Sequence, residues 1–226
     1  DQIRIQIAYP RLHVVLAGSS AGLTQGPDGA SHQSLEDMAL MRALPNMTVL
    51  VPADGVETEA MTEALATLDG PAYLRLGRYP VPDLLPAEYS FSLGRITTLA
   101  EGEDVTIMAC GHTVYTSLLA AEALTKRGIR ATVANVSTIK PLDTAAVRDL
   151  AARAPLVVTV EEHSIIGGLG SAVAEVLAEA GRGPRLVRLG TCDVFGESAN
   201  ADELMEKHGL TGPRIAERVA AELGQR

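Results

Sequence analysis

The chain has 226 residues, enough for one large domain or two ordinary ones, and its composition is 46% apolar but only 3% aromatic. A core so poor in Phe and Trp must be built from Ala, Val, Leu and Ile, as in helices packed on a buried parallel sheet. The formal charge of −9 argues against nucleic acid as a partner, because binding phosphates needs a basic surface.

No apolar run approaches the roughly 18 residues of a membrane span, and no signal peptide is recognised. These features predict a cytoplasmic protein that binds neither membrane nor nucleic acid. Cys110 and Cys192 show no CxxC or zinc-type spacing. We therefore expect two buried thiols in a reducing compartment.

Strand-like and helix-like patterns alternate through the first third of the chain. The opening DQIRIQIAY resembles the middle of a helix, so we expect further sequence upstream of Asp1. Asp54 is a predicted N-cap, because its carboxylate can accept free N–H groups of the next helix. The predicted elements are strands at 12–17, 47–51 and 72–76 and helices at 34–44 and 56–68.

Residues 79–90 (YPVPDLLPAEYS) are rich in proline and lack periodicity, which predicts an extended linker. The alternation then resumes, with strands at 105–110, 131–136, 156–161 and 185–189 and helices at 114–127, 144–153, 171–179 and from 201 to the end. This pattern predicts an α/β fold: two α/β domains with mainly parallel sheets. We place the first domain at 1–80, the linker at 81–90 and the second domain at 91–226.

The glycine-rich stretch 26–33 (GPDGASHQ) lies between a predicted strand and a predicted helix. Ligands of open α/β sheets bind on loops of this kind, at the carboxyl ends of strands. Asp28 and His32 are therefore candidate site residues, one as an acceptor and the other as a donor or proton carrier. The alternative is a turn at Asp28, with His32 and Ser34 capping the following helix. Spacing alone favours the alternative.

Two other loops carry candidate residues. Arg78 follows the predicted strand AYLRL, where its guanidinium either binds a phosphate or carboxylate or is simply solvated. The segment 161–170 (EEHSIIGGLG) lacks the GxGxxG spacing of a dinucleotide loop. We interpret its glycines as allowing the next helix to approach the sheet or a neighbouring subunit closely, with Glu162 and His163 pairing across that interface. HExxH, GxSxG and P-loop motifs are absent, and no metal ligands cluster.

Read as a whole, the string AGLTQGPDGASHQSLEDMALMRALPNMTVLVPAD resembles the pyrimidine-binding domain of the transketolase family. There a loop of the type D-G-x-[ST]-H-Q precedes a helix, and R-x-[IL]-P-N-[ML]-x-V and P-[AS]-D follow. The later strings STIKPLD, VTVEEHSIIGGLGSAVAEVLAE and DVFGES resemble the C-terminal domain of the same family. The resemblance is strongest to split transketolases, in which two chains divide the enzyme.

This resemblance implies a thiamine-diphosphate enzyme that moves a two-carbon ketol unit from a ketose donor to an aldose acceptor. By the same resemblance, Asp28 contacts the hydroxyl next to the donor carbonyl, and His32 contacts the carbonyl region and the terminal hydroxyl. Arg78 corresponds to the arginine that binds the substrate phosphate. The family's C-terminal domain has no direct catalytic role and mostly builds the dimer.

The sequence departs from the family pattern at Ser20. A histidine that helps to bind the substrate phosphate usually stands eight residues before the loop aspartate, and a neutral hydroxyl is a weaker phosphate ligand. Ser20 therefore suggests a specialised acceptor. The family's aminopyrimidine contacts fall upstream of Asp1 in the pattern, so we expect the cofactor-binding residues there and on a partner chain.

The sequence thus predicts the C-terminal subunit of an α2β2 heterotetramer whose N-terminal partner chain holds the diphosphate of thiamine diphosphate and Mg²⁺. No metal ligand is expected on this chain. One alternative is a β-type subunit of a 2-oxoacid dehydrogenase or a protein similar to deoxyxylulose-phosphate synthase. Another is a subunit that only assembles with other chains and has no catalytic part.

Overall fold

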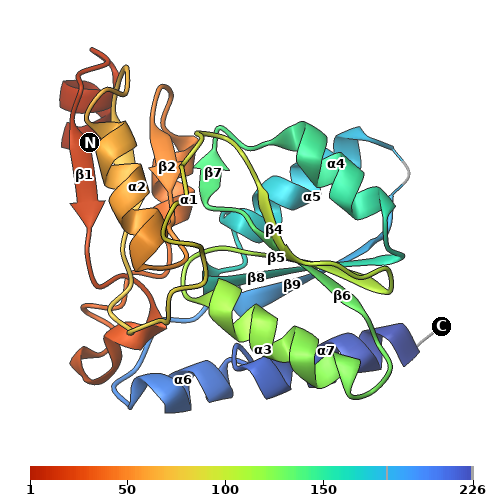
Figure 1. Cartoon of the computed structure of the whole chain (residues 1–226). Coiled ribbons are helices and arrows are strands. Elements are labelled where there is room, and N and C mark those ends of the chain that lie inside the picture. The colour runs from red at the N-terminus through yellow and green to blue at the C-terminus, as the bar shows by residue number, and fades with distance from the viewer. Residues whose placement is uncertain (182, 225–226) are drawn as a thin grey trace.

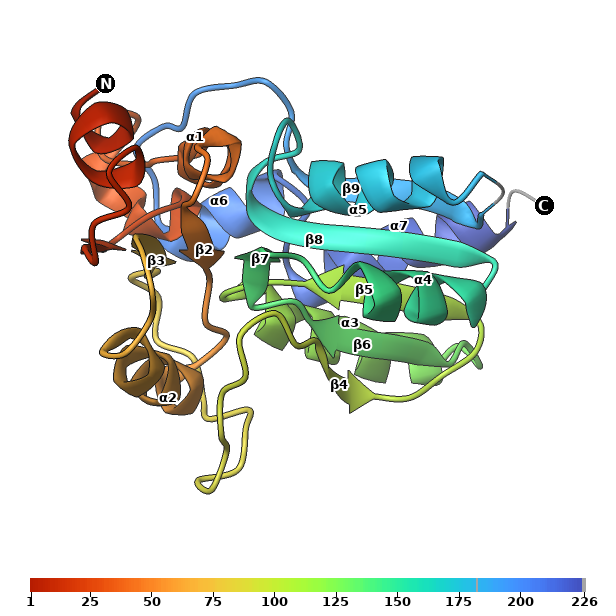
Figure 2. The same cartoon turned by 90° about the horizontal axis from the view of Figure 1, so that it is seen from above.

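The computed structural model describes residues 1–181 and 183–224, which form two sheets side by side (Figure 1, Figure 2). The first sheet has the order β1-β3-β2-β7. Here β3 pairs in parallel with β1 and β2, whereas β7 pairs antiparallel with β2. The strands are β1 (Val15–Gly18), β2 (Thr48–Leu50), β3 (Ala72–Arg75) and β7 (Thr138–Lys140).

The second sheet has the order β4-β6-β5-β8-β9, in which only the β4–β6 pair is antiparallel among the described strands. Its strands are β4 (Thr97–Ala100), β5 (Val105–Ala109), β6 (Ala131–Asn135), β8 (Leu156–Ser164) and β9 (Arg185–Thr191). Both sheets are mainly parallel, which confirms the predicted fold class. The strand β7 belongs to the second half of the sequence, so the first sheet draws on both halves.

Helices flank both sheets. They are the short π-helix η1 (Ile3–Ala8), the 3-10 helix η2 (Leu23–Asp28), α1 (Asp37–Ala43), α2 (Gly55–Leu65), α3 (Thr113–Thr125), α4 (Thr144–Ala152), α5 (Leu169–Glu179), α6 (Ala201–Lys207) and α7 (Gly212–Gly224). In Figure 1, α3 and α7 cover one face of the second sheet, and α4 and α5 cover the other. Within the described residues, no helix is long and apolar enough to cross a membrane.

Asp54 shows how one residue sets both a helix and the connection that follows. Its Oδ1 accepts the N–H of Glu57 at 2.8 Å, which confirms the predicted N-cap of α2. Its Oδ2 accepts the N–H groups of Leu84 and Leu85 at 2.6 and 2.9 Å. The extended segment predicted as a linker is therefore fixed against α2, and Leu85 is buried there.

The predicted elements are found within a few residues of their expected bounds, with three corrections. The strands β4 and β7 were not predicted, because each is short and gains its order from antiparallel pairing with a distant strand. The helix expected from 201 onward is divided into α6 and α7. Cys110 is buried as expected, but Cys192 is exposed.

The core crosses from one sheet to the other. Leu23 and Leu35, which flank the glycine-rich stretch, are buried in the same apolar cluster as Val160 and Leu204 of the second unit. Burying a leucine of this kind contributes about 1.5–3 kcal/mol. The loop that carries the candidate residues is thus held at both ends by the interior of the second unit.

Candidate functional site

Two candidate residues, Ser20 and Arg78, lie at the carboxyl edge of the first sheet. Because β1 and β3 are parallel and Gly18 pairs with Arg75, the segments that follow these strands leave the sheet at the same edge. Ser20 follows β1 with a left-handed φ of 59°, and Arg78 follows β3. Ala21 N–H donates to the carbonyl oxygen of Leu76 at 3.1 Å, which joins the two segments.

The loop 22–34 is closed at its base, where Gly22 N–H donates to the Ser34 carbonyl oxygen at 3.1 Å. Inside it, η2 is kinked at Gly26, whose φ and ψ of 68° and −116° are accessible essentially to glycine alone. Gly29 ends η2, with a φ of 74°. Leu23 and Gln33 are buried, whereas Asp28 and His32 face solvent.

Asp28 and Arg78 are in contact. Arg78 Nη1 lies 3.2 Å from Asp28 Oδ2, and the two side chains are 57% and 44% exposed. The side-chain amide of Gln25, a residue that sequence reasoning missed, also donates to Asp28. Because both side chains are accessible, this ion pair can open when a ligand binds. Asp28 can then accept a hydrogen bond from the ligand, and Arg78 can bind an anionic group of it.

His32 lies on the same loop and is exposed. Its Nδ1 is 3.0 Å from the hydroxyl of Ser31. The helix α1 begins only at Asp37, and its N-cap residue, Glu36, makes no side-chain capping bond. His32 and Ser34 therefore do not cap the following helix, so the capping part of the alternative is wrong, whereas a turn is present at Asp28, where Gly29 N–H donates to the Gly26 carbonyl oxygen at 3.2 Å.

Behind this loop lies a buried ion pair that sequence reasoning also missed. Arg75 and Asp37 are 4% and 6% exposed, with Nε and Oδ2 2.9 Å apart. Tyr73 donates to the same carboxylate at 2.6 Å, and Arg75 Nη2 donates to the carbonyl oxygens of Ser34 and Glu162. The available signal was an arginine inside the apolar strand AYLRL, because a charge in a buried strand needs a partner.

These contacts fix the protonation of the cluster. Burial raises the pKa of the Asp37 carboxyl, but the Arg75 cation and the hydrogen bonds from Tyr73 and Arg75 outweigh it, so that this pKa lies below its usual value. Burial and the Asp37 charge raise the pKa of Tyr73. Asp37 is therefore an anion at neutral pH, and the pair joins the base of the loop to the end of β3.

At the end of β8 the predicted close packing is found, but the expected pairing of Glu162 with His163 is not, since His163 lies beside Asp37 and Glu161 instead. Glu161 accepts the N–H groups of Leu169 and Gly170 at 2.7 and 2.8 Å, where α5 begins. A Cβ at Gly170 would lie 2.8 Å from Thr159 Oγ1, which confirms the close approach of helix and sheet. Glu162 accepts the N–H of Thr24 at 2.5 Å, so the interface crossed is the one between the two units.

His163 gives a stability prediction. It is fully buried, 4.0 Å from Asp37 and 3.7 Å from Glu161, and burial followed by the Arg75 cation lowers its pKa from 6.5 to about 4. On acidification the unfolded chain therefore takes up this proton first. We expect His163 to lower the free energy of unfolding by about 3 kcal/mol between about pH 6.5 and pH 4.

Denaturant unfolding of the wild type and His163→Gln across this range tests the prediction. The difference between the two profiles isolates His163 from groups common to both, such as Glu161, whose pKa burial raises to about 7 and whose pH effect has the opposite sign. Two parallel profiles would contradict the prediction.

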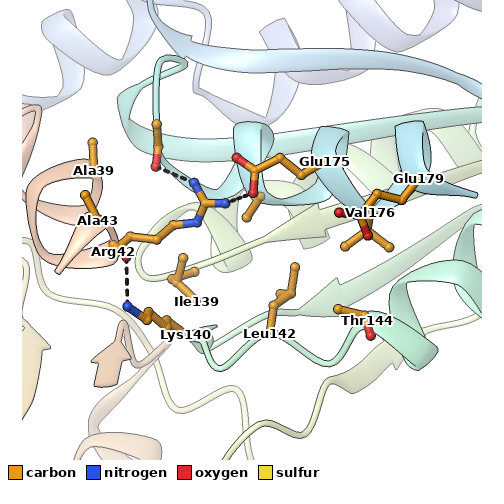
Figure 3. Close-up of a pocket in the computed structure, with 12 residues that line it drawn as sticks. Ala39, Arg42, Ala43, Ile139, Lys140, Leu142, Thr144, Glu175, Val176 and Glu179 are labelled. Atoms are coloured by element: carbon orange, nitrogen blue, oxygen red, sulfur yellow. Dashed lines mark hydrogen bonds and ion pairs between the residues drawn. The ribbon is translucent and has the colours of Figure 1, made fainter. Parts of the chain in front are cut away.

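A hollow of about 140 Å³ lies beside the site, lined in part by Gly77, Tyr79 and His112. A different hollow of about 510 Å³ lies between α1, β7 and α5 (Figure 3). Its charged side chains already have partners: Arg42 pairs with Glu175, Glu179 with Arg148, and Lys140 with main-chain carbonyl oxygens. No predicted site residue lines it. The candidate site is therefore the carboxyl edge of the first sheet.

Both halves of the chain match known domains. Residues 1–82 match the transketolase pyrimidine-binding domain, and residues 94–215 match the transketolase C-terminal domain. The fold and these matches define the class of protein: an α/β chain that joins a pyrimidine-binding unit to a transketolase C-terminal unit. The chain belongs to the transketolase family.

Individual relatives agree with this assignment. A 6-deoxy-6-sulfo-D-fructose transketolase subunit from a Clostridium species is 44% identical over 100% of this chain and 70% of that protein. A 1-deoxy-D-xylulose-5-phosphate synthase from Thermomicrobium roseum is 41% identical over 98% of this chain and 36% of the synthase. A solved split-gene transketolase, an inactive β4 tetramer, has a TM-score of 0.91 at 47% identity and covers 99% of this chain and 71% of that chain.

Proposed function

We propose that this chain is the C-terminal subunit of a split, cytoplasmic transketolase-type transferase. The enzyme moves a two-carbon ketol unit from a ketose or ketose-phosphate donor to an aldose-type acceptor. The observation that carries this proposal is the contact between Asp28 and Arg78 at 3.2 Å, on the loop of the pyrimidine-binding unit that also carries His32. Within the chain, residues 1–80 contribute to that unit, 81–90 form the linker and 91–226 form the C-terminal domain.

The side chains have distinct tasks in this proposal. Asp28 accepts a hydrogen bond from the donor hydroxyl next to the carbonyl, and His32 contacts the carbonyl oxygen and the terminal hydroxyl. Arg78 binds the anionic end of the sugar, with Ser20 as a neutral neighbour. These groups work by holding the substrate in a reactive orientation and by stabilising charge as it develops.

Thiamine diphosphate, when bound, supplies an electron sink for the cleavage of the carbon–carbon bond. In residues 1–181 and 183–224, no three His, Cys, Asp or Glu side chains converge as a metal site. We assign the Mg²⁺ and diphosphate contacts to the partner chain. We assign none of the described residues to the pyrimidine ring.

An N-terminal transketolase chain is the partner in this proposal, in an α2β2 heterotetramer. Two relatives support it. One is named a transketolase subunit, and the solved split-gene transketolase is an inactive tetramer of β chains alone. A β-type chain without its partner would lack the residues for the diphosphate and the metal, so its inactivity is the expected result.

A second candidate is a subunit with the activity of a deoxyxylulose-phosphate synthase, because one such synthase is 41% identical to nearly the whole chain. The two candidates differ in their carbon balance. A synthase of that kind releases CO2 from pyruvate, whereas ketol transfer between sugars releases none.

Reconstitution tests the proposal. The chain is assayed alone and with the N-terminal chain, in each case with thiamine diphosphate, Mg²⁺, a ketose phosphate and either a phosphorylated or an unphosphorylated aldose. We expect ketol transfer without CO2 only when both chains are present. Pyruvate-dependent CO2 release would favour the synthase, and transfer by this chain alone would overturn the need for a partner.

A further inference from the structure

A segment of the C-terminal unit packs against the loop that carries Asp28 and His32. Residues 196–202 lead from β9 into α6, and α6 lies directly against η2 (Figure 1). The glycines on either side of Asp28 touch this segment. A Cβ at Gly29 would lie 2.5 Å from Ser198 Oγ, and one at Gly26 would lie 3.3 Å from the Ala199 carbonyl oxygen.

Gln33 fastens the loop to this segment. It is 4% exposed, and its side-chain nitrogen donates to the carbonyl oxygen of Glu197 at 2.9 Å and to that of Gly26 at 3.0 Å. A Cβ at Gly196 would lie 1.7 Å from Gln33 Oε1, so the backbone reaches the amide only because position 196 is glycine. One side chain thus links the loop carrying Asp28 and His32 to the second unit.

Tyr79 makes a matching contact on the other side of the site. It directly follows Arg78, and its hydroxyl donates to Asp202 Oδ1 at 2.5 Å, in the first turn of α6. Its ring lies against the ring of His112, with centroids 4.6 Å apart. The segment that carries Arg78 is therefore attached to the C-terminal unit at two points, α3 and α6.

We infer that residues 196–202 set the spacing of Asp28 and Arg78, with Tyr79 and Gln33 as positioning residues. Asp28 stands between two glycines whose lack of a Cβ lets the loop lie close to Ser198 and Ala199, and Arg78 is held through its neighbour Tyr79 at the segment's end. The C-terminal unit thereby takes part in substrate alignment. The inference rests on the proposed function for its meaning in catalysis, but the attachment itself can be measured separately.

Tyr79→Phe removes the hydroxyl and keeps the ring against His112, so it tests the attachment with little disturbance. Asp202→Ala removes the acceptor, and Asp202→Asn restores one because an amide oxygen accepts the same hydrogen bond. Tyr115→Phe is the matched control, since its ring lies 6.5 Å from His112 on the helix α3. All variants are assayed as the complex with the N-terminal chain.

Tyr79→Phe and Asp202→Ala are each expected to raise the KM for a phosphorylated acceptor roughly threefold to tenfold and to leave kcat nearly unchanged, because one hydrogen bond is lost. The double variant should show no further loss. Asp202→Asn and Tyr115→Phe should resemble the wild type. An equal fall in kcat for every acceptor, or no rescue by Asp202→Asn, would overturn the positioning role.

Amide hydrogen exchange separates this inference from the proposed function. In Tyr79→Phe, peptides covering residues 23–34 and 76–80 should exchange faster while those of α4 and α5 do not change. Unchanged exchange at 23–34 and 76–80, or faster exchange throughout the chain, would overturn the inference whatever the activity. Faster local exchange in a complex that transfers no ketol unit would support the attachment and count against the proposed function.

Discussion

His32→Ala is expected to lower the turnover of the complex with the N-terminal chain at least about tenfold, or roughly 1.4 kcal/mol in the barrier. His32 is exposed on the loop 22–34, and within the described residues the only hydrogen bond of its side chain is to Ser31. Its removal should therefore leave folding intact and remove a donor to the substrate. Steady-state kinetics with a ketose phosphate and an aldose acceptor give the measurement.

His13→Ala is the matched control for this experiment. His13 is also exposed, but it precedes β1 and its ring nitrogen contacts the carbonyl oxygen of Leu65, away from the site. We expect wild-type turnover from this variant. Wild-type turnover in His32→Ala as well would remove His32 from the catalytic assignment.

The largest effect on stability is expected from Arg75→Met. The substitution leaves the Asp37 carboxylate buried without its guanidinium partner, and breaking a buried pair in this way costs about 3–5 kcal/mol. The carbonyl oxygens of Ser34 and Glu162 also lose their donor. Denaturant unfolding at pH 7 should show the loss as a lower midpoint.

Arg153→Met provides the comparison. Arg153 pairs with Glu101 at 3.5 Å, but the side chains are 50% and 71% exposed, so we expect a change of less than about 1 kcal/mol. Arg75→Met/Asp37→Asn should recover part of the loss, because the uncompensated charge is gone. Equal losses in the free energy of unfolding for Arg75→Met and Arg153→Met would contradict the expectation that the buried Arg75–Asp37 pair matters more than the exposed Arg153–Glu101 pair.

The local elements could be predicted because their causes are local. The alternation of apolar runs with helical patterns gave the order of strands and helices, and the side chain of Asp54 reaches only the first turn of the helix that follows it. The loop could be predicted from Gly26 and Gly29 for the same reason, because the ability to adopt a positive φ depends on the residue type at a single position.

Other features needed contacts between distant residues. The strands β4 and β7 form through antiparallel pairs with β6 and β2, and neither carries a strong pattern of its own. Asp37 meets Arg75 across 38 positions of sequence. Gln33 and Tyr79 carry no motif of their own, and their contacts with Glu197 and Asp202 arise only where the two units meet.

For the candidate site, the residue types and their order could be read from the sequence: an acid and a histidine on a glycine-rich loop, and an arginine after the third strand of the unit. The folded chain was needed to show that Asp28 contacts Arg78, that His32 does not cap a helix, and that residues of the C-terminal unit pack against the segments that carry Asp28 and Arg78. The reason is physical. Backbone conformation depends on neighbours in sequence, whereas ion pairs and burial depend on parallel strands ending at one edge and on two units sharing a core.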